Sequence, residues 1–295
     1  MTFKTSLLLV LAWASLAQPK LSVLIVDGVN NHDWKTATRE LNSILLATGR
    51  FRVDVSTSPP RDAAPEAWAS WRPHFADYSA VLLNWNGGDK ENGLRWPAEV
   101  ENDLLRYVRS GGGLIIFHAA NNAFLNWPEY NEMIGLGWRP KDFGPSLIIS
   151  ADGRVVTVPA GEGRNPGHGP RHDFQMAVLN PDHPITRGLP KHWLQPSEQL
   201  THGQHGPAAG LTILTYAWSK DVNENEPMDW VRTYGQGRVY TTMLGHTWAN
   251  EDNPNFRCKE FQVLIARGVE WAATGKVSLP TSAPSGGPAE RIAGR

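Results

Sequence analysis

Three histidines each follow a buried strand that the sequence predicts. They are His32, after the apolar run 21–27, His118, after the strand that begins beyond Gly111, and His246, after the run 238–244. In an α/β sheet the carboxyl ends of parallel strands meet at one edge, where ligands bind, so we expect these imidazoles to line one crevice. An imidazole titrates near neutral pH, and the predicted chemistry is therefore general acid–base catalysis or hydrogen bonding to a substrate hydroxyl or carbonyl.

The segment 111–121 (GGGLIIFHAAN) predicts a tight turn, a buried strand and then a sharp polar corner. Enzymes of several α/β families mount a serine or cysteine nucleophile on such a corner. This chain places His118 there, so its chemistry must use histidines and carboxylates instead. The alternative interpretation is a buried histidine that donates one hydrogen bond to a backbone carbonyl.

Glu198 is the acidic candidate, and with His118 it forms our predicted catalytic pair. Glu198 and His202 are four residues apart, a spacing that would place both on one face of a helix, where two such side chains can hold a metal. Further histidines that would make a metal site conceivable are His168, His172 and His205. Scattered histidines bind no metal in most proteins, so we predict neither a metal ligand nor a cofactor.

Substrate binding is assigned to polar and aromatic residues near the same strand ends. The flat apolar face of a tryptophan suits stacking on a sugar ring, and the chain has 13 tryptophans. The predicted substrate-binding residues are Asn30, His32, His172, His202, His246 and Trp248.

The elements that must position these residues alternate between strand and helix. Strands are predicted at 21–27, 51–56, 80–84 and after Gly111, and helices at 33–48, 97–109 and 256–274. This alternation predicts an α/β fold with a doubly wound, mostly parallel sheet and helices on both faces. Residues 230–234 and 238–244, joined by Gly-Gln-Gly, predict an added β-hairpin.

The length and net charge of the chain limit the class of protein. The chain has 295 residues and a net charge of −1, which gives no basic field for nucleic acid.

A signal peptide is predicted at 1–17 from Lys4, the apolar run 6–14 and the small residues up to Ala17. No other stretch is typical of a membrane span. We therefore expect an exported, periplasmic or extracellular protein with one domain at 21–275 and a flexible tail at 276–295. Cys258 is the only cysteine, so no internal disulfide is expected.

Five landmarks in order resemble the ThuA-like (trehalose utilisation) family of the class I glutamine amidotransferase-like superfamily. They are the loop 30–33 (NNHD), the segment 111–120, residues 182–190 (DHPITRGLP), residues 197–199 (SEQ), and residues 234–239 (YGQGRV) followed by 244–248 (LGHTW). The resemblance covers about 21–275 and implies a flavodoxin-like sheet and a link to sugar metabolism, including 3-keto-sugars. Amidotransferases of this superfamily carry a cysteine at the corner that His118 occupies, so glutamine hydrolysis is not expected.

These observations predict an exported protein of carbohydrate metabolism that acts on a sugar or keto-sugar glycoside through His118 and Glu198. Hydrolysis, lyase chemistry and isomerisation all fit such a pair. Two alternatives stay open: a non-catalytic sugar-binding or accessory protein, and a metal-dependent hydrolase. The expected partner is a small carbohydrate, and the sequence does not exclude a homo-oligomer.

Overall fold

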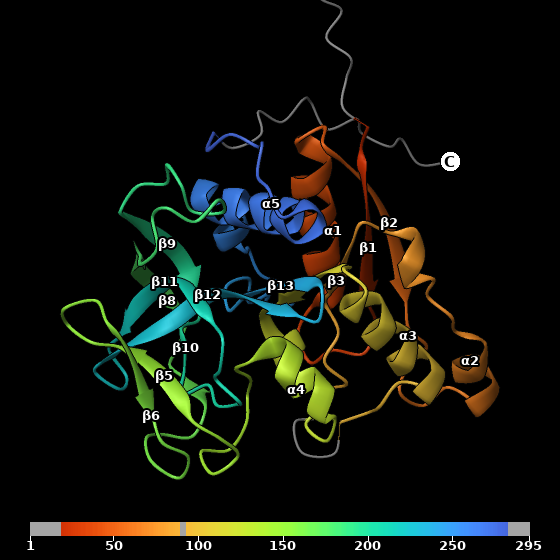
Figure 1. Cartoon of the computed structure of the whole chain (residues 1–295), viewed down its shortest axis with the longest axis horizontal. Coiled ribbons are helices and arrows are strands. Elements are labelled where there is room, and N and C mark those ends of the chain that lie inside the picture. The colour runs from red at the N-terminus through yellow and green to blue at the C-terminus, as the bar shows by residue number, and fades with distance from the viewer. Residues whose placement is uncertain (1–18, 89–92, 283–295) are drawn as a thin grey trace, which may run out of the picture.

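The computed structural model describes residues 19–88 and 93–282, and one large sheet dominates this part of the chain (Figure 1). Its parallel half has the order β2-β1-β3-β4-β13. The bounds are β1 (Leu21–Asp27), β2 (Phe51–Thr57), β3 (Ala80–Leu83), β4 (Gly113–Phe117) and β13 (Gly237–Thr242). This is the strand order of flavodoxin-like folds, whose ligands bind where the order reverses beside the first strand. The predicted fold class is confirmed.

Helices cover both faces of the parallel half, because its central strands are apolar on both sides. One buried core joins the sheet to α1 (Trp34–Ala47) and α5 (Lys259–Thr274), and a second joins it to α3 (Ala98–Arg109) and α4 (Pro128–Ile134). Figure 1 shows α1 and α5 together on one side of the strands and α3 and α4 on the other. Shorter helical segments are α2 (Pro65–Ser70), η1 (Phe75–Asp77), η2 (His118–Asn122) and η3 (Pro254–Arg257).

The start of α1 fixes the loop that carries His32. Asp33 is the N-cap, and its carboxylate accepts a hydrogen bond from the Thr36 backbone N–H at 3.2 Å. The Asp33 N–H also lies 3.5 Å from the Thr247 carbonyl oxygen. This cap and the contact with Thr247 place His32 at the carboxyl edge of the sheet, beside the loop that follows β13.

The antiparallel half of the sheet is larger than the hairpin that the sequence predicts. It continues from β13 in the order β12-β11-β8-β9, with β5 paired to β12 and β6 paired to β5. The bounds are β5 (Ser146–Ile149), β6 (Val155–Val158), β8 (His172–Val178), β9 (His192–Glu198), β11 (Thr212–Ser219) and β12 (Glu224–Tyr234). A separate two-stranded sheet pairs β7 (Gly167–His168) with β10 (Thr201–His202). Pro196 obscures β9 in the sequence, because proline is tolerated only at positions such as this outer strand, where one side of the backbone has no ladder partner.

Two predicted segments fall partly or wholly outside the described residues. The predicted signal peptide lies entirely outside them, so export remains a prediction. The predicted tail begins at 276, yet Ser278 and Leu279 donate backbone hydrogen bonds to the Glu270 carboxylate, and the Leu279 carbonyl accepts one from Arg267. These first tail residues therefore lie against α5. No helix in residues 19–88 and 93–282 combines the length and apolarity that crossing a membrane requires.

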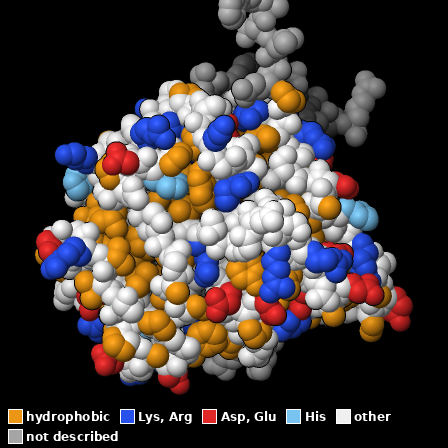
Figure 2. Space-filling model, viewed as in Figure 1, with side chains coloured by type: hydrophobic (Ala, Val, Ile, Leu, Met, Phe, Trp, Pro, Cys, Tyr) orange, Lys and Arg blue, Asp and Glu red, His pale blue; other side chains and the backbone are white. Residues whose placement is uncertain are grey.

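Charged side chains of both signs are interspersed over the face shown in Figure 2. Several acidic groups, in contrast, are deeply buried, and Glu226 is one of them. Glu226 on β12 is 2% exposed and accepts a hydrogen bond from the Gly203 N–H at 3.2 Å. Burial raises its pKa to about 8; the Gly203 hydrogen bond and the Arg164 charge lower the pKa by smaller amounts, and the Glu224 charge adds to the rise.

Glu226→Gln is expected to reduce the dependence of stability on pH. Between the ordinary carboxyl pKa near 4.5 and the folded-state pKa near 8, the unfolded chain ionises Glu226 while the folded chain keeps it protonated, so stability falls as pH rises. Glutamine keeps the hydrogen-bond acceptor and cannot ionise, and it should recover about 3 kcal/mol at roughly pH 7. Urea unfolding at about pH 5 and pH 8.5 measures this effect. If the wild type and Glu226→Gln lost the same stability between these two pH values, the prediction would be wrong.

Candidate functional site

Three imidazoles meet at the carboxyl edge of the parallel strands. His32 follows β1, His118 follows β4 directly and His246 follows β13. Their ring centroids are 4.9 Å apart for His32 and His118, 4.4 Å for His32 and His246, and 5.0 Å for His118 and His246. The structure thus brings together the three histidines that strand topology singled out.

His118 occupies a strained corner. Its φ is 45°, a left-handed value that is uncommon for a residue other than glycine, and only 6% of its surface is exposed. Its Nδ1 lies 2.7 Å from the Met243 carbonyl oxygen, which can only accept, so Nδ1 carries the proton. The Nε2 lone pair is then directed at His246 Nδ1, 3.2 Å away. Burial lowers the pKa of His118 to about 4, and at neutral pH the ring is uncharged.

Glu198, at the end of β9, holds the turn that carries His246. Its side chain is buried, and each of its two carboxylate oxygens accepts two hydrogen bonds. Oε1 accepts from the N–H groups of Gln199 at 2.9 Å and His246 at 3.1 Å, and Oε2 accepts from the Gly245 N–H at 2.7 Å and Asn255 Nδ2 at 2.9 Å. Since both oxygens are already engaged, this geometry favours a positioning role for Glu198 over the predicted role of general base.

The same turn requires Gly245. Its φ of 105° is open to glycine and strained for other residues, and a Cβ at this position would overlap the Phe117 ring. The turn therefore depends on one glycine and one buried carboxylate. Burial raises the pKa of Glu198 to about 7, while its four hydrogen-bond donors act in the opposite direction.

Two cavities adjoin the three histidines. A small inner cavity of about 40 Å³ touches all three, and an outer cavity of about 530 Å³ touches His32 and His246. His168 lines both cavities, and its ring centroid is 6.3 Å from that of His246. Other residues that line the inner cavity include Asn121, Trp138 and Thr201, and the outer one includes Asn30, Gln199 and Trp248.

Two of the predicted substrate-binding residues do not line either cavity. His172 donates a hydrogen bond from Nδ1 to the Pro170 carbonyl oxygen at 2.8 Å, and its ring packs against Phe174. His202 is half-buried and pairs with Gly167 in the small sheet of β7 and β10. Asn30 and Trp248 do reach the outer cavity, where Asn30 Oδ1 lies 3.1 Å from His32 Nδ1 and the Trp248 ring centroid is 4.1 Å from that of His246.

His168 and Trp138 were missed as substrate-binding candidates. Both enter the site from outside the parallel half, and their ring centroids are 5.7 Å apart. The only signal for His168 in the sequence is a loop rich in glycine, proline and histidine. No periodicity predicts that the β7–β10 pair would fold over the ends of the parallel strands.

The residues whose nitrogens could bind a metal differ from the residues that the sequence suggested. Among the described residues, the group of potential ligands whose atoms all lie within 4.8 Å of one another is His32, His118 and His246. The sequence-based set around Glu198 and His202 does not assemble. His205, for example, directs its two ring nitrogens at the carbonyl oxygens of Gly144 and Arg164.

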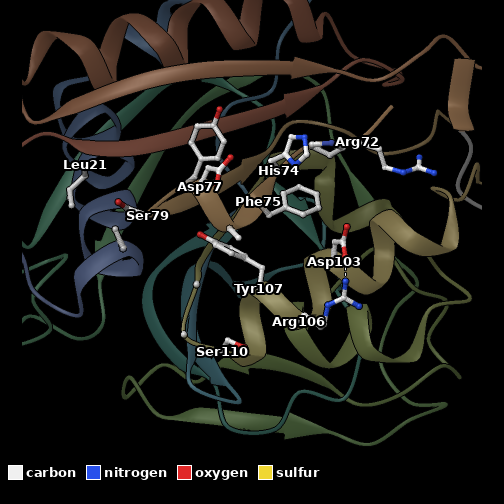
Figure 3. A pocket seen from close by; sticks show the side chains of 16 residues that line it. Leu21, Arg72, His74, Phe75, Asp77, Ser79, Asp103, Arg106, Tyr107 and Ser110 are labelled. Atoms are coloured by element: carbon white, nitrogen blue, oxygen red, sulfur yellow. Dashed lines mark hydrogen bonds and ion pairs between the residues drawn. The ribbon is translucent and has the colours of Figure 1, made fainter. Parts of the chain in front are cut away.

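A larger cavity of about 760 Å³ lies at the opposite, amino edge of the parallel strands (Figure 3). Leu21 begins β1 there, and Ser79 directly precedes β3. Figure 3 shows Arg106 and Asp103 paired on one wall, near Tyr107. Ligand sites in open α/β sheets lie at the carboxyl ends of strands, so the three-histidine edge is the better candidate despite its smaller volume.

Comparison with known proteins agrees with this architecture. The family described as "ThuA: Trehalose utilisation" matches residues 22–272. A crystal structure of a ThuA-like protein from Parabacteroides merdae is 36% identical, with a TM-score of 0.81, over 89% of this chain and 93% of that one. A ThuA-like protein from Bacteroides uniformis is 16% identical, with a TM-score of 0.57, over 92% of this chain and 98% of that one.

More distant structures share the fold alone. The carbohydrate deacetylase Agd3 is 10% identical, with a TM-score of 0.51, over 84% of this chain and 32% of that one. A search of curated protein sequences gave no match.

Proposed function

Because this chain belongs to the ThuA trehalose-utilisation family, whose name links it to carbohydrate metabolism, we propose that it is an enzyme acting on a sugar or keto-sugar glycoside. The substrate binds in the outer cavity and directs one hydroxyl or carbonyl oxygen at the three histidines. The observation that carries this proposal is the convergence of three imidazoles, from three separate strand ends, beneath one open cavity.

The outer cavity has the composition that a sugar requires. Its volume of about 530 Å³ lies within the usual range of small-molecule sites. Asn31 and Gln199 offer amide groups to hydroxyls, and Trp248 offers an apolar ring. The Arg171 guanidinium lies 4.3 Å from the Trp248 ring centroid and holds that ring in place at the rim.

His118 carries the central role at the inner end of the site. Its hydrogen bond to Met243 fixes the tautomer and leaves Nε2 as an electron-pair donor toward the inner cavity. That lone pair can accept a proton or a hydrogen bond from a sugar oxygen. Glu198 acts through His246 as a positioning residue.

Glutamine amidotransfer is disfavoured by chemistry as well as by sequence. The corner residue is His118, and Cys258 lies beside Leu194 and Glu260 at the start of α5, with its thiol pKa raised to about 11 by burial. A thiol in this state is a poor nucleophile at neutral pH.

Calorimetry and product analysis with matched panels of ordinary and 3-keto-disaccharides test the proposal. We expect saturable binding of at least one class and formation of a sugar product, with His172→Ala, outside both cavities, behaving as wild type. Binding without any product would support the alternative of a non-catalytic sugar-binding protein. Absence of both binding and turnover across the panel would overturn the assignment to sugars.

A further inference from the structure

We propose that His32, His118 and His246 form a binding site for one divalent transition-metal ion of the zinc class, with its remaining coordination position open to the inner cavity. Three histidines from the protein plus one exchangeable oxygen ligand is an arrangement used by catalytic zinc sites. The site differs from the ligand set that spacing in the sequence suggested, since neither Glu198 nor His202 takes part.

The distances fit such an ion. Zinc–nitrogen bonds of 2.0–2.1 Å at tetrahedral angles place two ligand nitrogens about 3.3 Å apart. His118 Nε2 and His246 Nδ1 are 3.2 Å apart, and one nitrogen from each of the three rings lies within 4.8 Å of the others. Small rotations of the partly exposed His32 ring would close the remaining gap, because His32 stands on a loop and not within a strand.

The hydrogen bonds around the rings orient them as ligands. His118 Nδ1 donates to the Met243 carbonyl oxygen at 2.7 Å, and His32 Nδ1 lies 3.1 Å from Asn30 Oδ1. Each acceptor fixes the proton on Nδ1 and so leaves the lone pair on Nε2. Metal-bound histidines characteristically donate their second N–H to a carbonyl or amide oxygen in this way.

The backbone is also built to hold the ligands rigidly. His118 is held at a φ of 45°, and Glu198 fixes the backbone N–H groups of Gly245 and His246. A strained corner and a buried four-donor carboxylate are costly features, and such features concentrate at functional sites.

The open position is where the substrate would meet the ion, and the bound ion takes the place of the direct contact between His118 Nε2 and a sugar oxygen. The inner cavity of about 40 Å³ has room for one or two water-sized groups, and Asn31, His168 and His246 line both it and the outer cavity. Assigning a sugar hydroxyl or carbonyl oxygen to this position rests on the proposed function. Metal binding itself does not.

Elemental analysis of the full chain, purified without chelators and then equilibrated with zinc, tests the proposal. We expect roughly one zinc per chain, lost on dialysis against a chelator and regained on adding zinc. His246→Ala and His32→Ala should each lower the bound zinc to below about one tenth per chain, whereas His172→Ala should retain it. Circular dichroism identifies any variant that fails to fold, and cobalt titration of the chelated wild type, followed by its visible absorption, gives a second reading of tetrahedral nitrogen ligation.

The outcomes separate this inference from the proposed function. Zinc that fails to bind the wild type, or that binds His32→Ala and His246→Ala as tightly as wild type, overturns the metal site. Full sugar turnover by the metal-free protein overturns the placement of a sugar oxygen on the ion and leaves the zinc site and the proposed function standing. Stoichiometric zinc with no sugar bound or converted upholds the site and removes the sugar assignment.

Discussion

Replacing Glu198 by alanine is expected to lower the free energy of unfolding by about 3–5 kcal/mol and to abolish sugar turnover. The carboxylate accepts four hydrogen bonds inside the protein, from the backbone of Gln199, Gly245 and His246 and from Asn255. Alanine leaves all four donors buried, and each carries the cost of lost solvation. Urea denaturation measures the stability, and the sugar panel measures the turnover.

Two control variants give this result its meaning. Glu198→Gln keeps one oxygen as an acceptor but turns an NH₂ group toward two donors, so it should lose about half as much stability as alanine does. Glu99 pairs with Arg72 at 2.6 Å, but its side chain is 75% exposed, so Glu99→Ala should change stability by less than about 0.5 kcal/mol. If Glu198→Ala matched Glu99→Ala in stability but still lost turnover, Glu198 would act on substrate and not through the turn.

The parallel half of the fold was predictable because its signals are local. Asp33 caps α1 as its position predicts, and the run 21–27 is apolar on both faces, as a central parallel strand must be. Apolar runs followed by polar residues also located the three histidines, because the carboxyl ends of parallel strands lie at one edge of a sheet.

The remaining part of the site depends on contacts between distant segments. Glu198 has a polar sequence environment typical of a catalytic acid, yet its partners Gly245 and Asn255 lie about fifty residues away and become visible only in the fold. His168 reaches the site through a two-residue strand that pairs with Thr201, and no periodic pattern marks so short an element. The sequence thus predicts which strand ends carry function but does not separate a residue that touches substrate from one that supports it.

Replacing His118 by asparagine is expected to reduce sugar turnover by about a thousandfold while unfolding stays cooperative. Asparagine tolerates the left-handed φ of 45° at this corner better than alanine, so the variant removes the imidazole with little added backbone strain. It gives up the hydrogen bond to the Met243 carbonyl, a cost of about 1 kcal/mol. Steady-state kinetics and urea unfolding measure the two quantities on the same preparation.

The comparison that gives this loss its meaning is with His172→Ala. His172 was a binding candidate on sequence grounds, and the structure places it outside both cavities, so this variant should keep wild-type turnover. Wild-type turnover by His118→Asn would remove the imidazole at the strand corner from the mechanism, whether it takes a proton or binds an ion. A thousandfold loss confined to His118→Asn would place the chemistry at the corner itself, because a general effect of removing a histidine from this edge of the protein would appear in both variants.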